Sequence, residues 1–332
     1  MDILETHAYD RRQRRNMSCA LLLSLSPFFL ASAAYLFLWA HDSSPPSIII
    51  AGFKAAPVLL LAAMVLGWNG WKSLVGVAGG LLLSAVGDFC LVWPELFIHG
   101  MGAFAAAHLL FSLAFLTARY VPRSRSSSLS VLLYIVMFGL GAAFYVYIYP
   151  FLRKAPDSHL LTPGVGVYVG LLTLMANLAL RTSKVVTILG SLSFLVSDSV
   201  LALQVFKVCS AMEHGHAVVM VTYYLAQMLI AMGDVLAVEE QDDFSKWTEV
   251  LLESYDEEKD IITRKGNAKA SATRRTKAWQ RIADCCAYAT SVLRQSNRWN
   301  KPTRSSWLRI ILQRYYVTMG EVLGSGNAAE EE

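Results

Sequence analysis

The sequence predicts an all-α membrane protein with about eight transmembrane helices, and two observations support this fold class. Of the 332 residues, 55% are hydrophobic and only 16% are charged, whereas roughly a quarter of the residues in an ordinary soluble domain are charged. The hydrophobic residues are concentrated in runs of about 20 residues, the length that a helix needs to cross a bilayer. Nearly all of these runs precede Glu239.

The expected spans follow one another along the chain with short polar connections between them. They cover residues 18–39, 47–67, 73–93, 97–118, 129–150, 162–180, 185–206 and 217–237. The first span follows a cluster of arginines that includes Arg11 and Arg15. Because its apolar run is too long for a signal peptide and lacks a clear cleavage site, we expect an uncleaved signal anchor.

The basic residues predict the orientation of these spans. If the N-terminus is cytoplasmic, the cytoplasmic segments hold ten Lys and Arg residues and the opposite side holds three, Arg153, Lys154 and Lys207. This bias places both termini in the cytoplasm, as an even number of spans requires. Residues 1–17 then form a basic cytoplasmic N-terminus, and residues 18–238 form the membrane domain.

Residues 239–332 read as a charged cytoplasmic tail. Residues 239–260 contain ten Asp and Glu against two Lys and Arg, and residues 261–320 contain 13 Lys and Arg against Asp284 alone. Tryptophan and aliphatic residues recur there at helical spacing, which favours amphipathic helices on an anionic membrane surface or a partner. A partly disordered tail explains the pattern equally well, and no nucleic-acid partner is expected.

Two of the spans resemble one another. Residues 80–91 read GLLLSAVGDFCL and residues 190–201 read GSLSFLVSDSVL, with the aspartates Asp88 and Asp198 at the same offset. The spans that follow match loosely. This similarity predicts a four-plus-four parallel repeat, which would place two equivalent aspartates near one pseudo-axis; chance similarity between leucine-rich helices is the alternative.

Ionisable side chains inside spans are the candidate functional residues, because each costs free energy in lipid and normally faces the bundle interior. Lys54, Asp88, His108 and Asp198 are of this kind, and their positions along the spans allow them to meet in one cavity. Further polar residues lie in the sixth and eighth spans: Tyr168, Tyr223, Tyr224 and Gln227. The alternative is that the aspartates only pair with Lys54 or cap helix contacts. Asp234, at the end of the last span, is expected to be interfacial.

Two known chemistries fit these residues poorly. An intramembrane aspartyl protease would need a GxGD motif and a YD pair, but residues 85–88 read AVGD and no tyrosine precedes Asp198. A zinc amidohydrolase would need several histidines at helical spacing, and only His108 lies well inside a span. The five cysteines form no spaced pair, so we expect neither a disulfide framework nor a metal site.

The order of several short motifs resembles the lysoplasmalogenase (YhhN-type) family of integral membrane hydrolases. These motifs are KAAP from Lys54, SAVGDFCLVW from Ser84, HG at His99 with His108 following, GVYVG from Gly166, FLVSD from Phe194 and YYLAQMLIA from Tyr223. They extend over residues 18–238 and so include all the expected spans. Family members tend to end soon after the last span, whereas this chain continues for a further 94 residues.

The resemblance implies hydrolysis of the vinyl ether bond of lysoplasmalogens, at the endoplasmic reticulum for animal members. The products are a fatty aldehyde and glycerophosphocholine or glycerophosphoethanolamine. A buried, protonated carboxyl group can protonate the β-carbon of a vinyl ether, and an ionised carboxylate can stabilise the resulting cation. Asp88 and Asp198 suit these roles with no cofactor or metal, while the other polar residues bind substrate or tune the pair. A lipid or small-molecule transporter and a non-catalytic lipid-binding protein are the alternatives.

Overall fold

The computed structural model is all α-helical, as predicted, over the part of the chain that it describes. That part is the backbone of residues 3–39, 45–120, 128–155, 157–208 and 215–263, with side-chain contacts described between residues 19 and 242 of these ranges. The helices are α1 (Ile3–Trp39), α2 (Ile48–Asn69), α3 (Val77–Cys90), α4 (Phe97–Leu116), α5 (Ser128–Leu152), α6 (Ser158–Thr182), α7 (Val185–Val205) and α8 (Gly215–Thr263). Three short 3-10 helices are η1 (Trp71–Val75), η2 (Pro94–Leu96) and η3 (Ala118–Tyr120).

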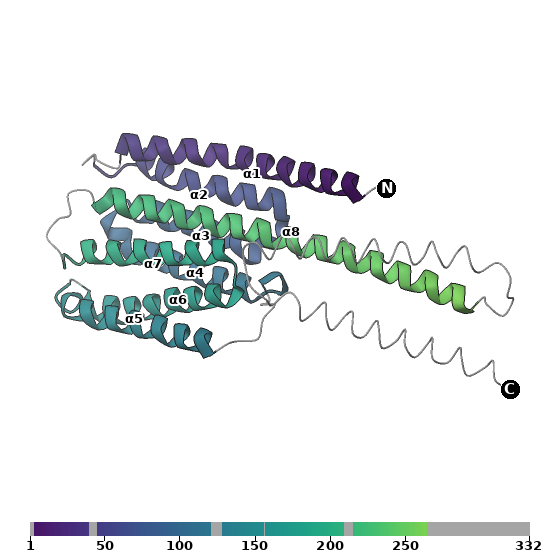
Figure 1. Ribbon diagram of the computed structural model, residues 1–332. Helices are drawn as coiled ribbons and strands as arrows, with labels where there is room; N and C mark the ends of the chain where they lie inside the picture. The colour runs from purple at the N-terminus through teal and green to yellow at the C-terminus, as the bar shows by residue number, and fades with distance from the viewer. Residues whose placement is uncertain (1–2, 40–44, 121–127, 156, 209–214, 264–332) are drawn as a thin grey trace, which may run out of the picture. The chain divides into compact units, whose positions relative to one another are not determined.

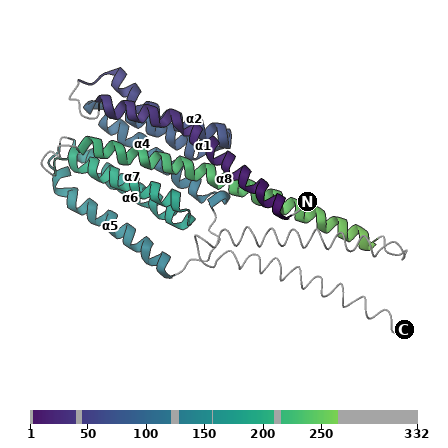
Figure 2. The same ribbon diagram turned by 45° about the horizontal axis from the view of Figure 1, so that its top comes forward.

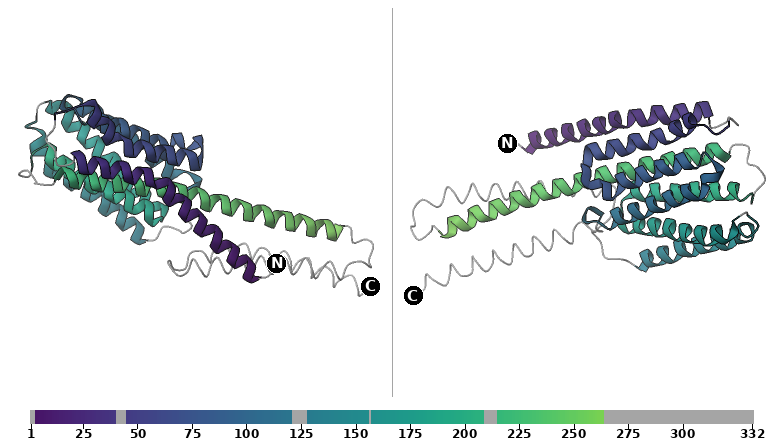
Figure 3. Two further views of the ribbon diagram at one scale, coloured as in Figure 1. Left: turned by 90° about the horizontal axis from the view of Figure 1, so that it is seen from above. Right: turned by 180° about the vertical axis from the view of Figure 1, so that it is seen from behind.

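The helices up to residue 244 form one compact unit, made of residues 1–122 and 126–244. Within it, α1 packs against α2, α2 against α3, α3 against α4, and α4 against α6, which also contacts α5 and α7. The bundle places α1 and α2 on one side and α5 on the other, with α8 between them (Figures 1 and 2). The view from behind agrees with this arrangement (Figure 3, right).

Seven helices of the described chain are long and apolar enough to cross a membrane. They are α1 over Cys19–Leu38, α2, α4 with η2, α5 over Val131–Leu152, α6, α7 and α8 as far as Asp242. Each matches an expected span to within a few residues. Large apolar side chains of α5 lie exposed on the bundle, among them Leu132, Ile135 and Val146, as a lipid-facing helix requires.

The third expected span, residues 73–93, differs from the structure. Its α-helix, α3, has 14 residues, which gives a length of about 21 Å against the roughly 30 Å of a bilayer core. Gly76, in an extended conformation, separates η1 from α3, and Pro94 begins η2. Hydropathy averages over a window and does not register such a break. Asp88 therefore lies in the last turn of α3.

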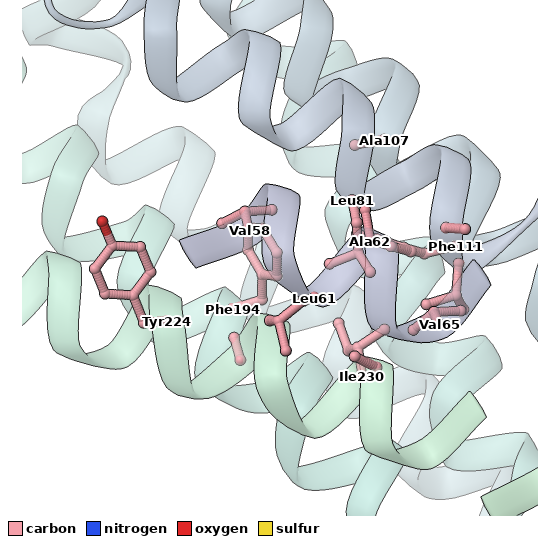
Figure 4. Close-up of a cluster of buried hydrophobic side chains, with 14 of the residues drawn as sticks. Val58, Leu61, Ala62, Val65, Leu81, Ala107, Phe111, Phe194, Tyr224 and Ile230 are labelled. Carbon is pink, nitrogen blue, oxygen red and sulfur yellow. The ribbon is translucent and has the colours of Figure 1, made fainter. Parts of the chain in front are cut away.

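Glycines bring α3 and α4 into close contact. A Cβ atom added at Gly80 would lie 2.3 Å from the Phe111 ring, and one added at Gly87 would lie 2.6 Å from the Phe104 ring. Small residues serve in this way at helix contacts in membranes. Phe111 and Phe194 belong to the apolar centre of the bundle, where α2, α3, α4, α7 and α8 meet (Figure 4).

Helix ends in this region have recognisable local causes. The Ser47 hydroxyl accepts a hydrogen bond from the Ile50 backbone N–H at 3.3 Å and caps the start of α2, which satisfies a group that the first turn leaves unpaired. Gly70, at φ 68°, ends the helix while its N–H donates to the Leu66 carbonyl. A side chain would be strained at this φ value. These two ends set the position of Lys54 within α2.

Candidate functional site

All the site residues predicted in the spans lie inside the bundle. Asp88 on α3 is 2% exposed, and the side chain of Asp198 on α7 is 11% exposed. The remaining predicted residues are buried or half-buried side chains on α2, α4, α6 and α8: Lys54, His108, Tyr168, Tyr223, Tyr224 and Gln227. None faces the lipid side of the bundle as a fully exposed residue would.

The first carboxyl group belongs to what we call the Asp88 cluster, formed by Asp88, Lys54 and Tyr223. Asp88 Oδ2 accepts a hydrogen bond from the Tyr223 hydroxyl at 2.6 Å. Asp88 Oδ1 lies 4.0 Å from Lys54 Nζ. The next residue of α8, Tyr224, donates to the Lys54 backbone carbonyl at 2.8 Å. Adjacent tyrosines of α8 thus hold the ends of α2 and α3 that carry the charged pair.

The second carboxyl group belongs to the Asp198 cluster, formed by Asp198, Tyr168 and His108. Asp198 Oδ2 accepts a hydrogen bond from the Tyr168 hydroxyl at 2.5 Å. His108 Nε2 lies 3.1 Å from that hydroxyl and 3.4 Å from Asp198 Oδ2. The other ring nitrogen of His108, Nδ1, is buried and has no hydrogen-bond partner.

Phe194 connects the two clusters. Its ring centroid lies 4.7 Å from that of His108 and 5.6 Å from that of Tyr223. The two carboxyl groups, from helices separated by more than 90 residues of chain, therefore share one polar region enclosed by aromatic rings. Phe194 was not among the predicted site residues, although it lies one helical turn before Asp198.

Two of the predicted residues do not contact either carboxyl group directly. Tyr224 packs edge-on against the rings of Phe28 and Tyr35 on α1, so its contacts are those of a packing residue. Gln227 lies one turn after Tyr223 and is fully buried; its amide lies beside the Tyr223 hydroxyl, but neither amide atom makes a hydrogen bond of standard geometry.

Asp234 is not interfacial, in contrast to the expectation from its place at the end of the last span. It is fully buried, accepts from Asn69 Nδ2 at 2.7 Å, from the Tyr120 hydroxyl at 3.1 Å and from Arg119 at 3.2 Å. We call these four residues the Asp234 cluster. Burial, reinforced by Asp234, raises the pKa of Tyr120 well above its ordinary value, so its hydroxyl stays protonated and donates.

The Asp88 and Asp198 clusters together supply two carboxyl groups, an amine, an imidazole and two phenol donors. This set can donate and accept protons within a region screened from water, the setting in which carboxyl groups act as acid and base. In the described part of the chain, no group of three His, Cys, Asp or Glu side chains is arranged to hold a metal ion.

Comparison with known proteins identifies the family. The sequence profile of the YhhN family matches residues 49–233. The chain belongs to the YhhN family. It is 38% identical over 210 residues to lysoplasmalogenase TMEM86B of Sus scrofa, which covers 63% of this chain and 85% of the relative.

Two further relatives match the chain over alignments of similar length. Lysoplasmalogenase TMEM86A of Homo sapiens is 34% identical over 228 residues, 64% of this chain and 88% of the relative. The lysoplasmalogenase of Mycobacterium tuberculosis is 32% identical over 197 residues, 58% of this chain and 72% of the relative. No solved structure matches the chain. With these relatives and its candidate spans, the chain is an integral membrane protein.

The C-terminal tail requires a correction. Residues 244–305 match a Myb/SANT-like DNA-binding domain, which contradicts the expectation that the chain has no nucleic-acid partner. The amphipathic helices predicted around Trp279 and Trp307 lie outside the described residues, which end at Thr263. A basic tail with periodic tryptophans fits a membrane-surface helix and a small helical DNA-binding domain equally well, so composition alone did not reveal the possible nucleic-acid partner.

Proposed function

We propose that this chain is a lysoplasmalogenase, which hydrolyses the vinyl ether bond of a lysoplasmalogen to a fatty aldehyde and a glycerophosphocholine or glycerophosphoethanolamine. The observation that carries the proposal is the convergence of Asp88 and Asp198 from α3 and α7 on one enclosed polar region. Similarity to relatives named lysoplasmalogenase, at 31–38% identity, supports the same reaction. No cofactor enters the proposed mechanism.

The neighbours of the two carboxyl groups suggest different roles for them. Asp88 has Lys54 Nζ 4.0 Å from one of its oxygens, so the negative charge of an ionised Asp88 can be balanced within the site. In the described part of the chain, the ionisable partners of Asp198 are Tyr168 and His108, and neither carries a permanent charge. We therefore assign Asp198 as the acid that protonates carbon and Asp88 as the carboxylate that stabilises the cation.

The reaction then proceeds in three steps with all protons accounted for. Asp198 gives its proton to the β-carbon of the vinyl ether, and the α-carbon becomes an oxocarbenium centre that faces ionised Asp88. Water adds to this centre and loses a proton to Asp88, and the product of this addition is a hemiacetal. As the hemiacetal collapses, Asp88 protonates the leaving glycerol oxygen and Asp198 removes the hydroxyl proton. Both carboxyl groups return to their starting states.

The hydrogen-bond donors around the carboxyl groups act as positioning residues in this scheme. Tyr223 holds one oxygen of Asp88, and Tyr168 holds one oxygen of Asp198. Each carboxyl group keeps its other oxygen for substrate or water. His108 fixes the Tyr168 hydroxyl from the other side, and Lys54 is placed to attract the phosphate of the substrate. Gln227 would orient water or the glycerol backbone.

The contacts of the two aspartates support a repeated architecture. Asp88 is contacted from α2 and α8, and Asp198 is contacted from α6 and α4. In a repeat of four helices, α2 corresponds to α6, α3 corresponds to α7, and α8 corresponds to α4. This reciprocal pattern is what a pseudo-twofold axis between two four-helix halves would produce, and we propose that the chain arose from such a duplication.

We also propose that α3 with its flanking turns forms an eighth crossing. Asn69, at the end of α2, and Arg119, just after α4, both contact Asp234. The ends of α2 and α4 therefore lie at the same end of the bundle, and the start of α4 lies at the other. The chain between them, which contains α3, must traverse the bundle.

The topology and location follow from this crossing number. Eight crossings place both termini on one side, and the excess of Lys and Arg in the connecting segments favours the cytoplasm. We propose that the protein resides in the endoplasmic reticulum membrane, with residues 239–332 as a cytoplasmic tail. Protease protection of tags at the two ends in sealed microsomes tests the orientation: both tags should be digested without detergent.

The direct test of the activity is aldehyde release by the purified full chain in detergent. A lysoplasmalogen should yield free aldehyde, whereas the matched lysophospholipid with a saturated ether should not react, because only the vinyl ether can form the oxocarbenium ion by protonation of carbon. A transporter would release no aldehyde in detergent and would move the lipid only across a sealed vesicle. Absence of aldehyde from folded protein would refute the proposed function.

A second proposed function concerns residues 244–305, which match the DNA-binding domain profile. From residue 264 to residue 305 the chain has eleven Lys and Arg and one acidic residue, Asp284, a balance suited to a phosphate backbone. We propose that this segment binds nucleic acid. Fluorescence anisotropy of labelled duplex DNA with the full chain in detergent should show binding that weakens steeply with salt. The chain truncated after residue 243 is the control, and equal binding by it would refute the proposal.

A further inference from the structure

Four helices around the proposed site carry polar side chains that are buried and have no hydrogen-bond partner. They lie on α3, α4, α7 and α8, and they are Ser84, Ser112, Ser191 and Gln227. Three of them are 0% exposed and Ser112 is 3% exposed. Buried polar atoms in folded proteins nearly always have a protein or water partner, so four neighbouring exceptions require an explanation.

These side chains are displaced from the site toward the same end of the bundle. Ser84 lies four residues before Asp88 on α3, and Gln227 lies four residues after Tyr223 on α8. Residues four apart share one face of a helix. Since α3 begins near Asp234 and the apolar part of α8 ends near it, both displacements point to the Asp234 cluster.

The other two helices show the same displacement. Ser112 lies four residues after His108 on α4, which ends near Arg119. Ser191 lies seven residues before Asp198 on α7, again on the same face. All four unpartnered side chains thus lie on the inner faces of their helices, between the two carboxyl groups and the Asp234 cluster.

Thr187 extends this series to the Asp234 cluster. Its hydroxyl is fully buried and lies beside Tyr120, but it makes no hydrogen bond of standard geometry. A Cβ atom added at Gly233, the neighbour of Asp234, would lie 2.5 Å from that hydroxyl. The series ends at Arg119, whose side chain is 20% exposed. It therefore runs from the site to a residue that reaches the surface.

Bonding within the helix does not account for these hydroxyl groups. Serine and threonine in membrane helices often donate to the carbonyl of the preceding turn. Thr173 and Thr222 do so here, at 2.6 and 2.8 Å, whereas Ser84, Ser191 and Thr187 do not. Their hydrogen-bonding capacity is directed to the bundle interior.

We propose that ordered water molecules occupy this face of the bundle, between the Asp234 cluster and the two carboxyl groups, and supply the water that the hydrolysis consumes. Hydroxyl and amide groups both donate and accept hydrogen bonds, which suits neutral water better than an ion, and none of the five unpartnered side chains is charged. Buried water typically joins such groups to one another. The use of the water rests on the proposed function; its presence does not.

The path gives the reaction a source of water separate from the lipid phase. A lysoplasmalogen brings its alkenyl chain from the lipid, where the exposed apolar side chains of the bundle surface exclude bulk water. A narrow path of hydroxyl groups admits water from the opposite direction, at the end of the bundle where Arg119 lies. Substrate and water would then reach the carboxyl groups by different routes.

Radiolytic labelling of the full chain in nanodiscs with water containing oxygen-18 detects buried water without reference to activity. Ile230 and Phe194 should be labelled although both are fully buried, because radicals form at the adjacent water. Met175 on α6 is equally buried and intrinsically more reactive, and it should remain unlabelled. Labelling of Met175 at the level of Ile230 would mean general water penetration and would overturn the proposal, as would no label at either place.

Two matched variants connect the path to the reaction. Gln227→Leu should remove most of the label at Ile230 and lower kcat roughly tenfold with KM little changed, as expected for a lost water-orienting hydrogen bond. Gln204→Leu makes the same chemical change near the other end of α7 and should alter neither. Full kcat and full labelling in Gln227→Leu would overturn the proposal. Labelling without any aldehyde from the wild-type chain would instead overturn the proposed function and leave the water path intact.

Discussion

The Asp88 and Asp234 clusters contain the same kinds of groups and differ in how completely the carboxylate is bonded. Each has a buried aspartate, a tyrosine donor and a basic side chain. Asp234 receives hydrogen bonds on both oxygens, from Asn69, Arg119 and Tyr120. Asp88 receives one, from Tyr223, and its other oxygen has only Lys54 at 4.0 Å.

This difference separates a carboxylate that joins helices from one that can react. An ionised carboxylate has about four acceptor sites on its two oxygens, and the contacts from Asn69, Arg119 and Tyr120 occupy those of Asp234. Asp234 accordingly ties α2, η3 and α8 together. Asp88 and Asp198 each have one tyrosine donor and an oxygen with remaining capacity, which is the state required of an acid or base that must exchange a proton.

The largest effect is expected from removal of either site carboxylate. Asp88→Asn and Asp198→Asn should each lower aldehyde release by about a thousandfold or more, since general acid–base catalysis contributes roughly 10²–10⁴. The asparagine amide is similar in size and can still accept from tyrosine, so thermal stability should change little. Asp234→Asn is the matched control, and its activity per folded molecule should stay near that of the wild type. An active Asp88→Asn enzyme would contradict the paired mechanism.

The same three variants should rank in the opposite order by loss of stability, with Asp234→Asn the most destabilised. Asp234→Asn should destabilise the protein by about 3 kcal/mol, because it leaves Arg119 without its charge partner and removes a charge-assisted bond to Asn69. The measurement is the midpoint of thermal unfolding in detergent, followed by tryptophan fluorescence. A midpoint equal to that of the wild type would show that the cluster does not join the helices.

The close approach of α3 to α4 should be sensitive to a single methyl group. Gly80→Ala places a Cβ atom against the Phe111 ring and should destabilise the protein by about 1–3 kcal/mol. Gly102→Ala on α4 has open space around the added Cβ and should be neutral or slightly stabilising. Equal unfolding midpoints for the two variants would contradict the packing of α3.

The adjacent tyrosines of α8 allow a smaller and more selective comparison. Tyr223→Phe removes the donor to Asp88 and should lower kcat roughly tenfold, the effect of one hydrogen bond. Tyr224→Phe removes a donor to the Lys54 backbone carbonyl and should change kcat by less than about threefold. Steady-state aldehyde release measures both. A reversed order of effects would mean that the position of Lys54 matters more than that of Asp88.

Much of the fold was predictable because apolar runs of membrane length leave few alternatives. The expected spans at 97–118 and 185–206 agree with α4 and α7 to within two residues. The helix of the third span is shorter than expected, because average hydropathy hides the break at Gly76 and the turn at Pro94. The reciprocal contacts of the two aspartates are a matter of packing between helices far apart in sequence, and no local pattern encodes them.

Part of the site was also predictable from the apolar runs, because charged residues within them are conspicuous. Asp88 and Asp198 stood out because a carboxyl group within an apolar run must be compensated. Asp234 was missed since it lies near the polar end of its span, and its partner Arg119 is 115 residues away. The unpartnered serines carry no charge, so their alignment becomes visible only when four helices are placed together.

The most direct test of the mechanism is hydrolysis of a lysoplasmalogen by the full chain in D₂O, with the aldehyde trapped as it forms and analysed by mass spectrometry. Protonation of carbon by a carboxyl group that exchanges with solvent predicts one deuterium on the carbon next to the aldehyde group, and aldehyde added directly to the same mixture controls for later exchange. An aldehyde from the wild-type enzyme that carries no deuterium beyond that control would contradict the account.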